Sequence, residues 1–327
     1  MLNFEEGKLL DELRTRKPSR VLVQLPEGIK TKAPEIAKLI ENEGIEVVFS
    51  GETAWGGCCV SVEEAKHAEC DLIVHFGHVK FMEVDFPVLY IEIKDELELL
   101  PLLEKSLDQL KNYNTLGLSY SIQHRHDVDK IINFYEEHDK KIILSAKKGY
   151  SAYEGHVVGC EFNGLKSIEQ DVDAFIVVGN NFHSMGACLM VEKPVFLLDV
   201  YNDCVSEMSG VRDKITRQRA MAIDKFKNSK IIGVLQEMKA GQNFGAAKIT
   251  KKKLEDAGKQ AIIITISEFT PDKLMNFYNI DSFVSLACPR IAVDDFAKYH
   301  KPILTYKEML VAVGEKTWDE LLESGFW

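Results

Sequence analysis

Seven cysteines are the residues of this chain with the most distinctive chemistry, because thiolates act as metal ligands and as nucleophiles. They lie at positions 58, 59, 70, 160, 188, 204 and 288 of the 327 residues. The spacing contains neither a Cys-x-x-Cys nor a Cys-x-x-x-Cys pair, which excludes the usual zinc ribbon, the thioredoxin motif and the three-cysteine loop of ordinary radical enzymes. Any metal site must therefore be assembled from distant parts of the chain.

Short apolar runs that alternate with amphipathic stretches indicate the elements that would position these thiols. Strands are predicted over residues 19–25, 45–50, 71–76 and 87–91, with a helix over 32–43. Strands separated by helical segments of this kind are typical of parallel sheets with right-handed crossovers. The predicted fold class is therefore α/β.

The strand pattern also repeats along the chain. Aspartates followed by apolar residues begin a strand at Asp71, Asp173 and Asp281, at intervals of 102 and 108 residues. Internal similarity at a fixed spacing predicts three related units of about 105 residues, each a small parallel sheet flanked by helices, arranged around a central site. The predicted units are residues 1–110, 111–212 and 213–327. A proline-led strand follows in each unit, from Pro87, Pro194 and Pro302.

Three of the cysteines take up related positions in this repeat. Cys58 and Cys160 each lie 13 residues before the aspartate that begins the next strand, and Cys288 lies seven residues after the corresponding aspartate of the third unit. All three are thereby placed near the carboxyl ends of parallel strands, which is the edge where α/β sheets bind ligands. Three such edges facing one centre would bring the three thiols together.

Three thiolates from separate units suit an iron–sulfur cluster with one iron left open, since four cysteine sulfurs are the normal complement. A zinc site built from the same residues is an alternative, although structural zinc usually draws on closely spaced pairs. Core packing is the alternative for any single thiol, because free cysteine is among the most buried residue types. Four cysteines fall outside the repeat register and are expected to be structural: Cys59, Cys70, Cys188 and Cys204.

Three further residues are candidates for binding a cofactor. Arg290 offers a planar fork of donors to a carboxylate, and an ion pair at the surface or between units is the alternative. Gln242 lies in the segment 241–245, a strand-to-helix loop whose N–H groups could bind an anion or a ribose, or could form a plain turn. His78 occupies in the first unit the position that Cys288 fills in the third, where core packing or hydrogen bonding is the alternative to catalysis.

The overall composition narrows the function classes. Hydrophobic residues make up 46% and charged residues 28% of the chain, as in soluble globular proteins. The net charge of −11 disfavours direct nucleic-acid binding, which needs clustered Lys and Arg. No apolar run approaches the ~18 residues of a membrane helix, and the N-terminal residues lack the features of a secretion signal. A cytoplasmic protein without membrane contact is expected.

Several short motifs occur in a fixed order along the chain. The most specific are Trp55-Gly-Gly-Cys-Cys, Gly155-His-Val-Val-Gly-Cys and Ala287-Cys-Pro-Arg-Ile-Ala-Val-Asp-Asp. Together they resemble the archaeal diphthamide synthase family, the 2-(3-amino-3-carboxypropyl)histidine synthases. Gly-Gly-Cys replaces the more usual Gly-Ala-Cys of the family, a departure that touches no ligand. Weaker matching pieces begin at Leu25, Asp71, Gln123, Gly179, Glu192 and Gly241.

The resemblance implies a homodimer of three-unit chains in which Cys58, Cys160 and Cys288 hold a [4Fe–4S] cluster. It implies that S-adenosylmethionine binds at the open iron and is cleaved between its sulfur and the γ-carbon of its methionine moiety. The resulting 3-amino-3-carboxypropyl radical would add to imidazole C2 of one histidine in elongation factor 2, the first step of diphthamide biosynthesis. A reductant protein would supply the electron.

Two other functions stay open on the sequence. A quinolinate-synthase-like lyase also uses three related units and a three-cysteine cluster, but there the open iron acts as a Lewis acid on a small molecule. The Cys-Pro-Arg and Gly-His-Val-Val-Gly-Cys segments fit the transferase and not that lyase. The other alternative is a non-catalytic subunit that binds elongation factor 2. The loss of a cluster cysteine would have favoured it, but all three are present.

Overall fold

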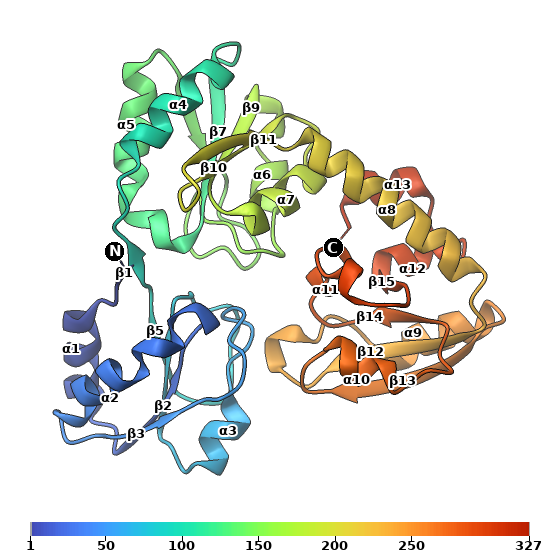
Figure 1. Cartoon of the computed structure of the whole chain (residues 1–327), viewed down its shortest axis with the longest axis horizontal. Helices are drawn as coiled ribbons and strands as arrows, with labels where there is room; N and C mark the ends of the chain where they lie inside the picture. The colour runs from blue at the N-terminus through green and yellow to red at the C-terminus, as the bar shows by residue number, and fades with distance from the viewer. Residues whose placement is uncertain (1, 327) are drawn as a thin grey trace.

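The computed structural model describes residues 2–326 and shows three sheet-centred lobes arranged as the corners of a triangle (Figure 1). The first and third lobes are built on four-stranded sheets, and the second on a five-stranded sheet. Helices flank each sheet, so the α/β class with parallel sheets is confirmed. The boundary expected after residue 212 falls within helix α8 (Ser209–Lys227), which runs from the second lobe to the third.

The first unit is a fully parallel sheet in the order β3-β2-β4-β5. In the register of its two central strands, Gln24 pairs with His75, which places both near the carboxyl edge. A separate two-stranded sheet pairs β1 with β6. The elements are β1 (Leu2–Asn3), α1 (Glu6–Arg16), β2 (Arg20–Gln24), η1 (Glu27–Lys32), α2 (Ala33–Glu41), β3 (Glu46–Phe49), α3 (Val62–His67), β4 (Leu72–Phe76), β5 (Val88–Ile91) and β6 (Lys94–Asp95).

The second unit has the strand order β11-β10-β9-β7-β8, in which only the edge strand β11 runs antiparallel to its neighbour. That edge strand follows β10 after a short turn, so no crossover helix is needed. Helix α4 packs its buried leucines on this sheet, although the predicted boundary after residue 110 places it in the first unit. The elements are α4 (Leu100–Leu110), β7 (Thr115–Tyr120), η2 (Ile122–Asp127), α5 (Val128–Glu137), β8 (Lys141–Leu144), α6 (Asn163–Lys166), η3 (Glu169–Asp171), β9 (Ala174–Gly179), α7 (Asn181–Met190), β10 (Val195–Asp199) and β11 (Cys204–Glu207).

The third unit repeats the topology of the first, in the order β13-β12-β14-β15 and with every strand parallel. Among residues 2–326, no helix combines the length and the apolar character that a membrane crossing requires. The elements after α8 are β12 (Ile231–Glu237), η4 (Ala240–Gln242), α9 (Ala247–Asp256), β13 (Gln260–Ile266), α10 (Pro271–Met275), β14 (Ser282–Ser285), α11 (Arg290–Val293), η5 (Phe296–Lys298), β15 (Ile303–Thr305), α12 (Tyr306–Ala312) and α13 (Trp318–Ser324).

The repeated aspartates have the same structural role in each unit. The Asp71 carboxylate accepts the Ser19 N–H at 2.7 Å, just before the first central strand. Asp173 accepts two backbone N–H groups at the start of β7, both at 2.8 Å, and Asp281 accepts two at the start of β12, at 2.8 and 2.9 Å. These bonds lower the pKa values of Asp173 and Asp281. The repeat marker is therefore a side-chain cap on the neighbouring strand.

The buried apolar side chains divide unequally among the units. One buried cluster joins the second and third units and includes Phe175, Phe226 and Leu304. The main cluster of the first unit, with Leu13 and Val74, draws its described members from that unit. Burying one apolar side chain of this size contributes about 1.5–3 kcal/mol to the free energy of folding. The second and third units thus share a core, whereas the first unit meets them mainly through loops and hydrogen bonds.

A buried ion pair fixes the third unit from within. Arg219 of α8 and Glu308 of α12 are 1% and 0% exposed. Nε and Nη2 of Arg219 donate to the two Glu308 oxygens at 2.6 and 2.7 Å. Nη1 and Nη2 also donate to the carbonyl oxygens of Ala292 and Ile303, at 2.6 and 2.7 Å. One guanidinium therefore connects α8, α11, β15 and α12.

Replacing Glu308 with Ala should lower the free energy of unfolding by about 3–5 kcal/mol, because the Arg219 charge would stay buried without its partner. Urea unfolding followed by circular dichroism measures the change. Asp256→Ala breaks the exposed pair with Lys252 on α9 and is the matched control, for which the urea midpoint should not move. Equal shifts in the two variants would contradict this role of the buried pair.

Candidate functional site

Cys58 lies in the loop between β3 and α3, where loops of two units meet. A β-carbon at Gly57 would lie 2.2 Å from the Val79 carbonyl oxygen, and one at Gly241 would lie 2.5 Å from Cα and the carbonyl oxygen of Cys58. The Gly241 N–H donates to that same carbonyl oxygen at 3.1 Å. The absence of a side chain at Gly241 allows the third unit to approach Cys58, and its absence at Gly57 allows the loop after β4 to approach within the first unit.

Gln242 lies beside the thiols of the first unit and is 3% exposed. Its Nε2 is 2.9 Å from Cys59 Sγ and 3.5 Å from Cys58 Sγ. Turning the amide over lets the nitrogen donate instead to both Glu237 carboxylate oxygens, at 2.5 and 2.7 Å. In either orientation the amide connects the Cys58 loop with the carboxyl end of β12.

Cys160 and Cys288 form the opposite side of the site. Cys160 lies between β8 and α6, and Cys288 lies between β14 and α11; both are half-buried and free. Burial raises the pKa of each thiol to about 12, and the charge of Cys288 contributes to the rise at Cys160. Both thiols are therefore protonated near neutral pH, and metal binding here must release protons.

Arg290 ties these two cysteine loops together and is 4% exposed. Its Nη1 donates to the Gly159 carbonyl oxygen at 2.9 Å, and its guanidinium carbon lies 3.6 Å from the centroid of the Phe182 ring. The guanidinium also pairs with Asp294, four residues later. The ion pair of Arg290 is therefore buried within the third unit, while its contact with the second unit is a hydrogen bond and a ring contact; carboxylate binding by Arg290 stays a prediction.

The chain matches the diphthamide synthesis protein family over residues 25–322. It belongs to that family. It is 28% identical over 324 residues to the 2-(3-amino-3-carboxypropyl)histidine synthase of Pyrococcus horikoshii, a match that covers 97% of this chain and 93% of the relative. It is 31% identical over 332 residues to subunit 1 of the synthase of this name from Kluyveromyces lactis, covering 97% and 77%.

Solved structures agree with this assignment. The crystal structure of Dph2 from Pyrococcus horikoshii with a 4Fe-4S cluster superimposes with a TM-score of 0.90 at 26% identity, covering all 100% of this chain and 94% of that one. A second crystal structure of Dph2 from this organism gives 0.89 at 27% identity, covering 97% and 92%. The family resemblance found in the sequence is confirmed, and these relatives favour the synthase over a quinolinate-synthase-like lyase.

Three cysteines of this family member are the candidates to hold a cluster. Within residues 2–326, no three His, Cys, Asp or Glu side chains converge as ligands of one metal ion. In a [4Fe–4S] cluster each cysteine binds a different iron, so the thiols stand further apart than the ligands of one ion. Cys58, Cys160 and Cys288 are three half-buried free thiols, one on a loop of each unit.

Three histidines follow strand ends, His78, His124 and His183, and His156 bridges to Tyr120 at the end of β7. Burial lowers the pKa values of His78 and His156 to about 4 and that of His183 to about 3, and it also lowers the pKa of His124. The charge of Arg290 lowers the His183 pKa further. All four imidazoles are therefore neutral at pH 7. Sequence reasoning gave a role only to His78, although the others carry the same signal of a position close after a strand or beside Cys160.

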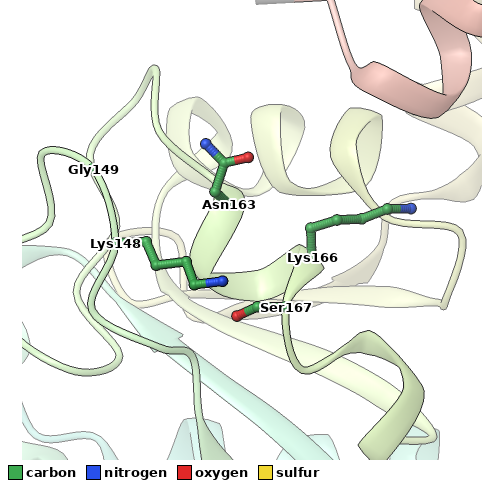
Figure 2. Close-up of a pocket in the computed structure, with 5 residues that line it drawn as sticks. All are labelled: Lys148, Gly149, Asn163, Lys166 and Ser167. Carbon is green, nitrogen blue, oxygen red and sulfur yellow. The ribbon is translucent and has the colours of Figure 1, made fainter.

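A surface hollow of about 490 Å³ lies beside the Cys160 loop, and no cysteine lines it. Figure 2 shows Lys148 reaching across it from one loop while the other polar side chains come from α6 and its end. Lys166 already pairs with Glu169 at 2.8 Å. The hollow therefore gives no support to a ligand site apart from the cysteines. Its lining residues are Lys148, Gly149, Asn163, Lys166 and Ser167.

Glu237, the last residue of β12, is a site residue that the sequence did not reveal. It is 4% exposed, and burial raises its pKa to about 8. The carboxyl is therefore mostly protonated in the folded protein at neutral pH. Its sequence surroundings carry no distinguishing motif, because the effect comes from burial against another unit's loop.

The raised pKa predicts how Glu237 contributes to stability as pH changes. The folded state binds the Glu237 proton more tightly than the unfolded chain, so this stabilisation is fully present below the usual value of 4.5 and is lost as pH rises toward 8. Wild type should therefore lose stability relative to Glu237→Gln by up to about 1.4 kcal/mol per pH unit across this window. Urea unfolding of both proteins at several pH values measures the difference. Glu268→Gln removes a nearby acidic side chain and is the control for loss of charge. If the unfolding free energies of wild type and Glu237→Gln changed in parallel with pH, the raised pKa of Glu237 would be contradicted.

Proposed function

We propose that this chain transfers the 3-amino-3-carboxypropyl group of S-adenosylmethionine to C2 of a histidine imidazole in elongation factor 2, the first step of diphthamide biosynthesis. The observation that carries the proposal is the presence of one free, half-buried cysteine on a loop of each unit in a member of this family. Relatives that cover nearly the whole chain bear the name of this synthase.

Cys58, Cys160 and Cys288 would hold a [4Fe–4S] cluster. A reduced cluster, when bound, supplies the electron that breaks the bond between the sulfur and the γ-carbon of S-adenosylmethionine. The chain itself binds and orients the two substrates and keeps water from the reacting groups. A polar transfer of the same group needs no electron, so dependence on a reductant distinguishes the two routes.

We propose Gln242, Arg290 and His78 as the side chains that contact S-adenosylmethionine or position the groups that do. Gln242 and Arg290 each lie against a cysteine loop, and His78 lies in the loop next to Cys58. The burial of Gln242 and Arg290 and their existing partners favour positioning for these two residues, whereas His78 is half-buried and open to direct contact.

Exposed aromatic side chains near the cysteines support a protein substrate. Trp55, three residues before Cys58, is 63% exposed, and Phe182 beside Arg290 is 41% exposed. Tyr150 is 37% exposed and stacks on Phe81 with ring centroids 3.8 Å apart. Aromatic residues of this kind are enriched where proteins dock. A homodimer, a reductant protein and a cytoplasmic location are further parts of the proposal, carried by the family resemblance and composition.

A single anaerobic assay tests the function. Reconstituted protein is mixed with dithionite, carboxyl-labelled S-adenosylmethionine and archaeal elongation factor 2. We expect label on the factor and release of 5′-methylthioadenosine. Turnover with the cluster kept oxidised, or 5′-deoxyadenosine as the main product, would rule out the proposed radical mechanism.

Separate Cys→Ala substitutions test the three ligands. Ala at position 58, 160 or 288 should sharply reduce both iron content after reconstitution and transfer activity, because each thiol binds a different iron. Cys59→Ala is the closest control, since Cys59 adjoins Cys58 but is fully buried, and it should keep its iron. Iron and sulfide per chain are the readouts. A Cys59→Ala protein without iron would show that the wrong thiol of the pair was chosen.

Gly241→Ala tests the contact that seats the Cys58 loop. The added β-carbon would lie 2.5 Å from Cys58 backbone atoms, so the loop must move and iron content should fall severalfold. Gly210→Ala, at a helical glycine with nothing within 4 Å of the added carbon, is the matched control and should keep its iron. Full iron content in Gly241→Ala would mean that this contact does not position Cys58.

A further inference from the structure

A chain of hydrogen bonds runs from the Cys59 backbone to His78 through two fully buried side chains. Nε2 of Gln24 donates to the Cys59 carbonyl oxygen at 2.7 Å and to Ser61 Oγ at 2.9 Å. Oε1 of Gln24 accepts the Ser61 N–H at 3.1 Å and lies 3.1 Å from His75 Nδ1. His75 Nε2 lies 3.0 Å from His78 Nδ1. Gln24 and His75 are both 0% exposed.

The backbone partners at one end fix every proton along this chain. A carbonyl oxygen only accepts and a backbone N–H only donates, so Cys59 and Ser61 both set the same orientation of the Gln24 amide. Its oxygen then faces His75 Nδ1, which must carry the proton. Burial lowers the pKa of His75 well below its ordinary value, so the ring is neutral and its Nε2 is bare. His78 Nδ1 must therefore donate to it.

The same reasoning leaves His78 with a bare Nε2. The pKa of His78 is lowered to about 4 by burial, so the ring carries one proton, and Nδ1 has it. Within the part of the chain that the structure describes, the ring also bonds to the Phe76 backbone, which acts to raise its pKa, and no side-chain partner is found for Nε2. The side chain is half-buried rather than sealed in the core. A lone pair of fixed direction is thus available to a ligand.

His78 lies within the candidate site. The following residue, Val79, has its carbonyl oxygen against Gly57, next to Cys58. The preceding residue, Gly77, accepts a hydrogen bond from Gln123 Nε2 of the second unit at 2.9 Å. The His78 ring also contributes to lowering the pKa of His183 of the second unit. The ring therefore stands where the first and second units meet, beside the Cys58 loop.

We propose that His78 uses its bare Nε2 to accept a hydrogen bond from a donor group of a bound substrate, with Gln24 and His75 as positioning residues that hold this tautomer. This rests on the function proposed above. Both substrates carry suitable donors: S-adenosylmethionine has ribose hydroxyls and an ammonium group, and the target histidine has an imidazole N–H. A neutral acceptor of this kind rejects carboxylate and phosphate groups, whose lone pairs would face its own.

The tautomer is measured first, on the full-length protein labelled with ¹⁵N and ¹³C at its nine histidines. Solid-state spectra distinguish protonated from bare ring nitrogens, and the difference from His78→Asn assigns the His78 signals. We expect a protonated Nδ1 and a bare Nε2 in the wild type, and loss of this fixed tautomer in His75→Phe. A wild-type His78 with the proton on Nε2 would overturn the proposal. This readout does not depend on transferase activity.

The donor is identified by adding each substrate separately to the holoenzyme with the cluster oxidised. A shift of the His78 Nε2 signal with S-adenosylmethionine alone assigns the acceptor to that cofactor. A shift only with elongation factor 2 assigns it to the protein histidine. No shift with either substrate, or with both together, would overturn the proposal.

Two variants separate the acceptor from the structural role of His78. Asn at this position keeps a donor to His75 but offers no acceptor at the place of Nε2, so kcat/KM should fall about tenfold or more. His78→Gln places an amide oxygen near the Nε2 position and should recover part of that loss. Equal activity of the two variants would contradict the acceptor role, provided that both retain wild-type iron content. A wild type that transfers no group would instead refute the proposed function and leave the tautomer measurement standing.

Discussion

The burial of the Arg290 guanidinium between the second and third units is the interaction on which the site depends. Its Nη1 bond to Gly159 and its stacking on Phe182 hold the Cys160 and Cys288 loops together. The thiols cannot do this for themselves, because protonated thiols with pKa values of about 12 attract one another only weakly. A buried guanidinium is costly unless its donors are satisfied, so the carbonyl and carboxylate partners are as necessary as the charge. The loops are thereby arranged before any cofactor is bound.

Arg290 in turn depends on a second guanidinium. It begins α11, a helix of four residues that is too short to be stable alone. Arg219 donates to the Ala292 carbonyl of that helix and to Glu308, so the position of α11 is set by α8 and α12. The Cys58 loop takes its charged support at its start, where Lys30 Nζ donates to the Gly51 and Glu52 carbonyl oxygens and Lys239 Nζ donates to that of Thr53. Closer to Cys58 the loop is held by backbone contact at Gly57 and Gly241 and by the Gln242 amide. Two of the three cysteines are thus fixed by the Arg290 network, and the third by steric fit together with lysine contacts at the start of its loop.

Much of this arrangement could be predicted from the sequence, because the repeat has a local physical cause. Asp71, Asp173 and Asp281 cap the neighbouring strands in the same way, and such a cap leaves a readable spacing. The position of each cysteine relative to that marker placed it near a strand end. The partners of Arg290, the burial of Glu237 and the hydrogen bonds of Gln24 could not be predicted. Each depends on which loops of different units touch, and neither residue type nor spacing along the chain carries that information.

The protonation states of the side chains around the site set its charge before and after a cluster binds. At neutral pH the thiols of Cys160 and Cys288 are protonated, Glu237 is mostly protonated, and His78 is neutral. Thiolate formation on cluster binding adds negative charge to the site. The nearby Glu237 is mostly protonated and so carries little negative charge, while Arg290 remains positive. This balance lowers the electrostatic cost of gathering three thiolates in a buried place. Because the site's ionisable side chains are mostly neutral, the substrates must be recognised by groups of fixed geometry. The hydrogen-bonded chain of Gln24, His75 and His78 holds such a group.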